Sequence, residues 1–243
     1  MGRTLRPLAP DTTYHLMARG SGKRKIFEGD ADRFSFLRIV DTVSLERGWR
    51  HHAWCLMTNH VHFLTTTPSA DLSDGMSEIL GQYSRRFGHF NERTGHLFAD
   101  RFRSVVVDHD EQFLATVRYI ALNPIKAGLA SKPDAYWWSS HSDRDRQRRL
   151  LDSFDESLLL AMLSPLAKVA DAQYRALIAA AVAPSRAGAE LPSIGTLIDA
   201  LGVQSGAVAA IELGYEVIDV AEVSGLSERQ IKYQVSCARS RAA

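Results

Sequence analysis

The chain has 243 residues, of which 45% are hydrophobic and 23% are charged, and its formal net charge is +1. This composition is typical of folded globular proteins and argues against intrinsic disorder. The sequence contains no apolar run of membrane-spanning length, and its N-terminus lacks the apolar core of a signal peptide. Two distant cysteines, Cys55 and Cys237, follow no disulfide or metal spacing, so we expect a soluble cytoplasmic protein with no membrane partner.

Strand and helix patterns alternate through the first half of the chain. Stretches rich in β-branched and aromatic residues predict strands, and apolar residues three or four apart predict helices. In chain order the expected elements are strand, helix, strand, strand, helix, strand and helix, at residues 12–18, 30–48, 49–57, 61–67, 72–94, 103–110 and 111–123. A turn at Thr58 and Asn59 joins the two middle strands, and Pro124 is expected to end the last helix.

The first six of these elements follow the split β-α-β order of ferredoxin-like folds. The two middle strands join directly, whereas both other crossings use a helix. We therefore predict an α+β fold with an antiparallel sheet for the first part of the chain.

The second half of the chain has a different character. We predict a first domain at residues 1–145, a helical connector and linker at 146–192, and a C-terminal all-α region at 193–243. Within the last region, residues 217–241 resemble a helix-turn-helix, with a turn at Gly225 and a helix capped by Ser227. An ordinary helical hairpin with a glycine turn fits this pattern equally well.

His60 and His62 lie two residues apart at the start of a predicted strand. Side chains at positions i and i+2 of a strand share one face, so both imidazoles can reach a single ion. Taken alone, such a pair is more often part of the surface or the core than a metal site.

A second pair, Tyr119 and Asn123, lies four residues apart on a predicted helix and so also shares one face. Alone, this pair is as compatible with a packed aromatic residue and an asparagine that ends the helix. Together, the two pairs supply two imidazoles, one amide oxygen and one phenol. That combination suits a metal site with a nucleophile beside it.

Four motifs carry a family resemblance: "LMTNHVHFL", "GHLFADRFRS", "VRYIALNPIKAGL" and "YWWSSH". Their order and spacing resemble the single-tyrosine HUH transposases with an IS200-like domain, and more closely the REP-associated tyrosine transposases. The resemblance spans about residues 12–142. It departs from the family at Thr58, where relatives often carry proline, and the last hundred residues match nothing that we can identify.

The resemblance implies an enzyme that cleaves and rejoins single-stranded DNA at hairpins such as REP elements. His60, His62 and Asn123 would hold Mg²⁺ or Mn²⁺, and Tyr119 would attack the phosphorus to form a 5′-phosphotyrosine link. Imidazole ligands alone would equally suit Zn²⁺ or Mn²⁺, so the choice of metal comes from the family. Relatives include dimers and enzymes that work as monomers, and the sequence is compatible with either state.

Basic residues near the motifs are candidates for contacts with the DNA backbone, although each one alone is as compatible with a solvated surface charge. The candidates are Arg19, Lys23, Arg24, Lys25, Arg85, Arg86, Arg101 and Arg103, with Arg229 and Lys232 in the C-terminal region.

Three other functions remain open from the sequence. A non-catalytic, sequence-specific DNA-binding regulator derived from a transposase would use the helix-turn-helix as its working part. A replication initiator or relaxase would share the chemistry, but the order of the motifs argues against it. A metallohydrolase with a water nucleophile would use His60 and His62 without Tyr119.

Overall fold

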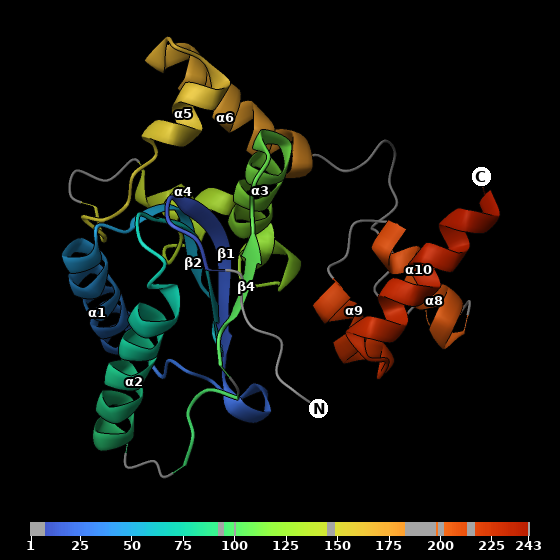
Figure 1. Ribbon diagram of the computed structural model, residues 1–243, viewed down its shortest axis with the longest axis horizontal. Helices are drawn as coiled ribbons and strands as arrows, with labels where there is room; N and C mark the ends of the chain where they lie inside the picture. The colour runs from blue at the N-terminus through green and yellow to red at the C-terminus, as the bar shows by residue number, and fades with distance from the viewer. Residues whose placement is uncertain are drawn as a thin grey trace. The chain divides into compact units, whose positions relative to one another are not determined.

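The computed structural model describes residues 8–91, 95–99, 101–144, 149–182, 198, 202–212 and 217–242. The chain divides into two compact units, residues 1–182 and 183–243, and each is described by itself (Figure 1). Within these ranges, none of the helices has both the length and the apolar character that crossing a membrane requires.

The first unit is built on a four-stranded antiparallel sheet. Its strands are β1 (Thr12–Arg19), β2 (Arg50–Leu56), β3 (His60–Thr67) and β4 (Arg103–Val106), in the order β2-β3-β1-β4. With the helices between them, this order is that of the ferredoxin-like fold, so the predicted fold class is confirmed.

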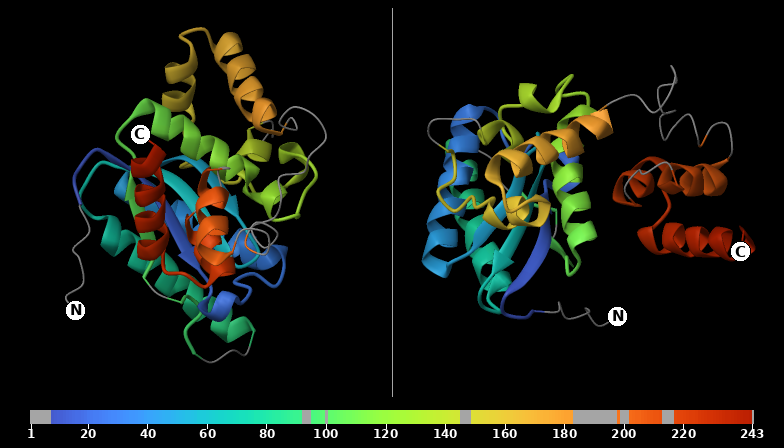
Figure 2. Two further views of the ribbon diagram at one scale, coloured as in Figure 1. Left: turned by 90° about the vertical axis from the view of Figure 1, so that its right-hand side faces the viewer. Right: turned by 90° about the horizontal axis from the view of Figure 1, so that it is seen from above.

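Helices cover both faces of the sheet (Figures 1 and 2). Helices α1 (Asp30–Arg47) and α2 (Leu72–Phe90) pack together on one face, and α3 (Asp110–Lys126) packs on the other against β2 and β3. The ring of Phe63 on β3 lies near Phe36 of α1, whereas the ring of His62 lies near Tyr119 of α3. Successive side chains of a strand point to opposite faces of the sheet. Alternate side chains of β3 therefore pack toward α1 and α2, and the side chains between them face α3.

Helix α3 continues through Pro124 to Lys126, so the prediction that it ends before this proline is wrong. Proline removes one backbone donor, a loss that a helix tolerates when only its last turn follows. The last turn is closed by hydrogen bonds from Ala127 N to Asn123 O (3.0 Å) and from Leu129 N to Pro124 O (2.8 Å). As a result, Asn123 and Lys126 belong to the same helix as Tyr119.

Several other strand and helix boundaries differ from the predicted ones by one residue, and two differ by more. Strand β4 ends at Val106 rather than at residue 110, because α3 already begins at Asp110. Helix α2 ends at Phe90, and residues 92–94 of its predicted range lie outside the described residues.

The segment after α3 packs onto the same core. It contains η2 (Pro133–Ala135), α4 (Ser140–Asp143), α5 (Ser157–Leu163) and α6 (Ala167–Val182). The His141 Nδ1 atom lies 2.8 Å from the Tyr174 hydroxyl of α6, and the Arg144 guanidinium lies 3.9 Å from the centre of the Tyr174 ring. The first unit therefore reaches Val182, and it includes the helices of the segment predicted as a connector. Residues 146–148 and 183–192 of that segment lie outside the described residues.

The C-terminal unit contains α8 (Val203–Glu212), α9 (Val217–Ser224) and α10 (Glu228–Ala242) around a small core of Ala207, Ala210, Val220, Ile231 and Val235. Between α9 and α10, Gly225 has φ of 71°, a left-handed conformation that favours glycine. Ser227 and Gln230 form a reciprocal cap: the Ser227 hydroxyl accepts from Gln230 N (3.3 Å), and Gln230 Oε1 accepts from Ser227 N (2.9 Å). The sharp turn and the capped helix are compatible with the predicted helix-turn-helix.

Two glycines on α2 offer a matched test of packing between α1 and α2. A Cβ atom at Gly75 would lie 2.4 Å from the ring of Trp49, a buried side chain whose indole N–H donates to Asp71. At Gly81 the nearest atom would lie at 3.5 Å, an ordinary contact. We expect Gly75→Ala to lower the free energy of unfolding by about 2 kcal/mol, because overpacking outweighs the gain in helix propensity.

Gly81→Ala keeps only the gain in helix propensity and is expected to raise the free energy of unfolding by up to about 1 kcal/mol. Urea denaturation followed by tryptophan fluorescence measures both variants. It reports on the first unit alone, because Trp49, Trp54, Trp137 and Trp138 all belong to it. Equal stability of the two variants would contradict the close approach at Gly75.

Candidate active site

His60 and His62 open β3 and share the face that α3 covers. In the strand register Arg19 of β1 pairs with His60, and Met17 pairs with His62. His62 is 3% exposed and His60 is half-buried, and their ring centroids lie 4.9 Å apart. The structure therefore places the two predicted imidazoles side by side at the start of the strand.

Asn59 fixes the tautomer of His60. The Asn59 Nδ2 group donates to Lys23 O (3.2 Å), which leaves the amide oxygen Oδ1 facing His60 Nδ1 at 2.7 Å. A carbonyl oxygen only accepts hydrogen bonds, so Nδ1 of His60 carries the proton. In the neutral imidazole the lone pair is then on Nε2, the atom that can bind a cation.

His15 of β1 is the hydrogen-bond partner of His62 Nδ1, as Asn59 is of His60 Nδ1. Its Nε2 atom lies 3.0 Å from His62 Nδ1, so one of these nitrogens donates to the other. His62 Nε2 is buried and has no hydrogen-bond partner among the described residues. If His62 Nδ1 donates to His15, the buried Nε2 atom carries the lone pair that can bind a cation.

Burial keeps the imidazole rings of His15 and His62 neutral. It lowers the pKa of His15 from 6.5 to about 4, with a smaller contribution from the positive charge of Arg103. Burial also lowers the pKa of His62 well below 6.5, with smaller contributions from His60 and His15. Neutral imidazoles are the form that binds metal ions.

Tyr119 projects from α3 toward these histidines. Its ring centroid lies 5.4 Å from that of His62 and 5.7 Å from that of His15, in both cases edge to face. The Lys126 ammonium lies 5.3 Å from the centre of the Tyr119 ring. The site thus contains a phenol between two imidazoles and one cation.

Asn123 lies one helical turn after Tyr119 and is 8% exposed. Its Nδ2 atom is buried and has no hydrogen-bond partner among the described residues. A half-turn of the amide would exchange Nδ2 for the oxygen that a metal ion requires. Across the described ranges, no three side chains of histidine, cysteine, aspartate or glutamate are arranged to hold a metal, so a site here would depend on the amide.

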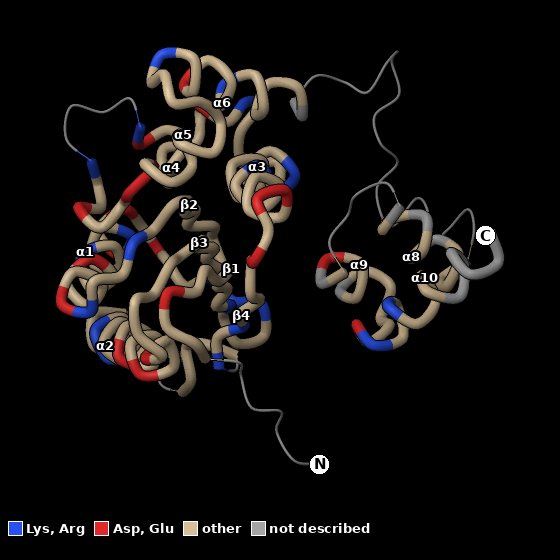
Figure 3. The backbone as a smooth tube through the Cα atoms, turned by 45° about the horizontal axis from the view of Figure 1, so that its top comes forward, with Lys and Arg blue, Asp and Glu red and all other residues tan. Residues whose placement is uncertain are grey.

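The predicted basic residues fall into distinct groups. Arg19 and Arg103 are half-buried on the face of the histidines, since Arg103 pairs with Met17 and Arg19 pairs with His60. Figure 3 shows lysine and arginine positions gathered beside β4. The remaining candidates of the first unit are exposed: Lys23, Arg24 and Lys25 on the loop after β1, Arg85 and Arg86 on α2, and Arg101 before β4.

Backbone hydrogen bonds hold the loop after β1 against the turn that precedes His60. Gly20 N donates to Asn59 O (2.8 Å), and Ile26 N donates to Thr58 O (3.1 Å). Arg85 and Arg86, in contrast, belong to the helix that covers the opposite face of the sheet. Arg229 and Lys232 are exposed on α10 of the C-terminal unit, and Lys232 lies 3.8 Å from Glu228.

Three residues of the site, His15, Asn59 and Lys126, were not predicted from the sequence. The alternating pattern of residues 12–18 puts His15 on one face of a strand, but only the strand order and register bring that face to His62. Asn59 was assigned to the turn alone. Lys126 was missed because Pro124 was expected to end the helix.

A comparison with known proteins agrees with this fold. Residues 9–123 match the sequence model of a family described as "Transposase IS200 like". A solved REP-associated tyrosine transposase bound to a REP hairpin has a similar structure, with a TM-score of 0.51 and 19% identity, covering 65% of this chain and 94% of the other. A second solved structure, a transposase candidate of Deinococcus radiodurans R1, has a TM-score of 0.35 and 16% identity, covering 53% of this chain and 98% of that one. No curated protein matches the chain.

The neutral state of His15 can be measured directly in the metal-free protein. In a ¹⁵N NMR titration we expect the imidazole to remain neutral until the pH falls to about 4. Arg103→Ala should raise this pKa only part of the way toward 6.5, because burial, the larger cause, remains. Arg101→Ala, a change at an exposed neighbour, should leave it unchanged. A pKa of His15 near 6.5 in the native protein would contradict the buried pairing with His62.

Proposed function

Because residues 9–123 match the model of the IS200-like transposase family, we propose that this protein cleaves and rejoins single-stranded DNA with Tyr119 as the nucleophile. The observation that carries the proposal is the position of the Tyr119 ring against His62 and His15. A phenol at that place lies beside the imidazoles that would bind the metal, where an attacking group is needed.

In the proposed reaction the Tyr119 oxygen forms a bond to the phosphorus of a DNA phosphodiester. The bond from phosphorus to the 3′-oxygen breaks, and the strand that leaves takes up a proton as its 3′-hydroxyl, balancing the proton lost by the phenol. The other strand remains joined to Tyr119 through its 5′-phosphate. Attack by a 3′-hydroxyl reverses these steps, so strands can be rejoined without an external energy source.

His60, His62 and Asn123 are the residues that would hold a divalent cation, Mg²⁺ or Mn²⁺. The buried atoms His62 Nε2 and Asn123 Nδ2, which have no hydrogen-bond partner within the described ranges, support this assignment. So does the Nδ1 proton that Asn59 holds on His60. When bound, the cation would polarise the scissile phosphate and stabilise negative charge on its oxygens. His15 would act on His62 alone, by keeping its ring orientation and tautomer.

Lys126 supports the role of Tyr119. A neutral phenol is a weak nucleophile near neutral pH. An ammonium group 5.3 Å from the ring centre lowers the electrostatic energy of the phenolate that develops during attack. Arg19 and Arg103, on the same face, would bind the phosphates on either side of the reacting one.

The proposed substrate is DNA that forms hairpins, as REP-like repeats do. The solved relative of similar fold is bound to a REP hairpin, which supports this choice. In the C-terminal unit, the exposed Arg229 and Lys232 on the capped helix α10 would contact duplex DNA. We further propose that the enzyme works in the cytoplasm, as a monomer or a homodimer.

Substitution of the nucleophile is the direct test of the proposed chemistry. With labelled single-stranded hairpin oligonucleotides and Mn²⁺, the native protein should form an adduct that survives SDS electrophoresis. Tyr119→Phe should abolish the adduct because the attacking oxygen is missing, whereas hairpin binding should persist. Tyr14→Phe is the matched control, because the Tyr14 hydroxyl pairs with the backbone of Ala9 and its ring is on the other face of the sheet.

Two outcomes would contradict the proposal. Binding without an adduct under Mg²⁺ or Mn²⁺ would favour a DNA-binding regulator. Cleavage that survives Tyr119→Phe would favour a metallohydrolase with a water nucleophile.

The metal assignment can be tested without DNA by titrating Mn²⁺ into the protein and measuring affinity by calorimetry. His60→Ala and His62→Ala should abolish binding. His15→Ala should weaken it about tenfold, because the second partner of a metal-binding imidazole typically contributes that much. The control is His89→Ala, an exposed histidine on α2. Equal affinities for the His15→Ala and His89→Ala variants would contradict the role of His15.

A further inference from the structure

The C-terminal unit separates its charges along the chain. Within residues 202–242, all four lysine and arginine residues follow Gly225, whereas four of the five acidic residues precede it. Helix α10 therefore carries all the cations of this range, and α8 and α9 carry none. A helix that concentrates positive charge complements the phosphates of a nucleic acid. The cations are Arg229, Lys232, Arg239 and Arg241, and the acids are Glu212, Glu216, Asp219, Glu222 and Glu228.

A tight turn fixes α10 against α9 (Figure 1). Only three residues join the two helices. Of these, Gly225 takes the left-handed conformation that the sharp turn requires, and Leu226 packs against the core of the unit. Ala221 of α9 packs against the same core, and its small side chain permits close packing of the helices. The core thus determines which side of α10 is turned outward.

The outward side of α10 carries a guanidinium, an aromatic ring and a hydroxyl. Ile231 and Val235 form the buried side of the helix. At 3.6 residues per turn, Arg229, Tyr233 and Ser236 lie one turn apart on the opposite side. All three are exposed, and Tyr233 is the most prominent of them, with 67% of its surface exposed.

The side chains at the two edges of this outward side differ from those at its centre. Lys232 lies about a quarter-turn to one side of Tyr233, and its ammonium is 3.8 Å from the Glu228 carboxylate. Gln230 lies at the other edge, where its Oε1 atom accepts from the Ser227 hydroxyl at 2.7 Å. The centre of the outward side is thus formed by Arg229, Tyr233 and Ser236, with a cation at one edge.

This arrangement suits the major groove of duplex DNA, which is wide enough for an α-helix. A helix in the groove turns the centre of its outward side to the base edges and its own edges to the phosphates. An arginine can donate two hydrogen bonds to guanine, a serine can bond to several bases, and an apolar ring can contact the methyl group of thymine. A helix that only neutralised phosphates would gain little from a tyrosine and a serine at its centre.

We propose that α10 lies in the major groove and reads one particular duplex sequence, with Arg229 and Tyr233 at the base edges and Lys232 at a phosphate. The inference rests on the proposed contact of α10 with duplex DNA, and it extends that contact from charge attraction to the reading of sequence. It gives the C-terminal unit a binding site separate from the residues around Tyr119.

The test begins with a pool of short DNA duplexes whose central base pairs are randomised. The full-length protein selects from this pool in the presence of EDTA, so that no metal-dependent cleavage occurs. We expect one sequence to be enriched. By fluorescence anisotropy, the enriched duplex should then bind on the order of a thousandfold more tightly than a duplex of the same composition in scrambled order.

Substitutions on α10 separate base contacts from phosphate contacts. Arg229→Ala and Tyr233→Ala should each weaken binding of the enriched duplex by about tenfold and leave the scrambled duplex nearly unchanged. Lys232→Ala should weaken both duplexes by the same factor and reduce the dependence of affinity on salt. Arg38→Ala is the matched control, since Arg38 is an exposed arginine on α1 of the first unit. Circular dichroism establishes that each variant is folded.

Three results would overturn the inference. If no sequence is enriched, the unit does not read duplex DNA. An equal loss for both duplexes in Arg229→Ala would make Arg229 a phosphate contact. An enriched sequence whose binding survives both Arg229→Ala and Tyr233→Ala would place the reading elsewhere in the chain. Failure of the proposed chemistry is a separate result, because it would appear as a missing adduct with hairpin oligonucleotides and Mn²⁺.

Discussion

The alternation of side chains along β3 is the constraint on which the site depends. Phe63 faces α1 and α2 in the core, and His62 on the other face meets α3. A strand whose one face is fixed by core packing cannot slip by one residue without exposing that core. The position of the two imidazoles is thus set by the same packing that stabilises the fold, and α3 brings Tyr119 to them.

Burial determines the chemistry that this face can support. Water would protonate an exposed imidazole below its ordinary pKa, but burial lowers the pKa of His15 to about 4 and that of His62 well below 6.5. Each imidazole that we propose as a metal ligand also has a partner on Nδ1: Asn59 for His60 and His15 for His62. A second residue therefore orients each of the two imidazoles. For His60 this residue comes from the turn before β3, and for His62 it comes from the neighbouring strand β1.

The sequence predicted the parts of this arrangement that depend on local spacing. The order of elements, the shared face of His60 and His62, and the pair of Tyr119 and Asn123 all follow from strand and helix periodicity. His15 could not be predicted in the same way, because its partner is 47 residues away and the contact depends on strand register. Lys126 required a helix that passes through proline.

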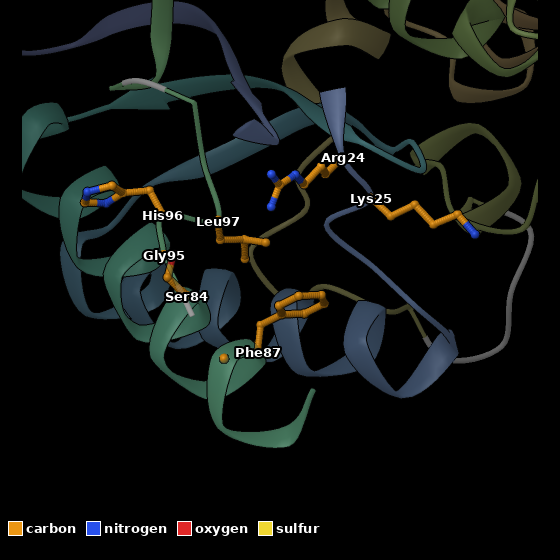
Figure 4. A pocket seen from close by; sticks show the side chains of 8 residues that line it. Arg24, Lys25, Ser84, Phe87, Gly95, His96 and Leu97 are labelled. Carbon is orange, nitrogen blue, oxygen red and sulfur yellow. The ribbon is translucent and has the colours of Figure 1, made fainter. Parts of the chain in front are cut away.

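The positions of the basic residues also could not be predicted from local sequence spacing. Sequence proximity grouped Arg85 with the active-site cations, yet α2 covers the opposite face of the sheet. Arg24 and Lys25 are neighbours in the chain, but their side chains extend in different directions (Figure 4). Their shared positive charge did not indicate which of these residues lie near the histidines, because the fold determines the direction of each side chain.

The most direct test of the account is to identify the residue that becomes linked to DNA. After reaction with a hairpin oligonucleotide and nuclease digestion, trypsin should release the peptide of residues 119–126, since it cleaves after Arg118 and Lys126. Mass spectrometry should find this peptide carrying a nucleotide through its 5′-phosphate on Tyr119. A nucleotide on any other residue, or none on any peptide of a protein that binds the hairpin, would contradict the account.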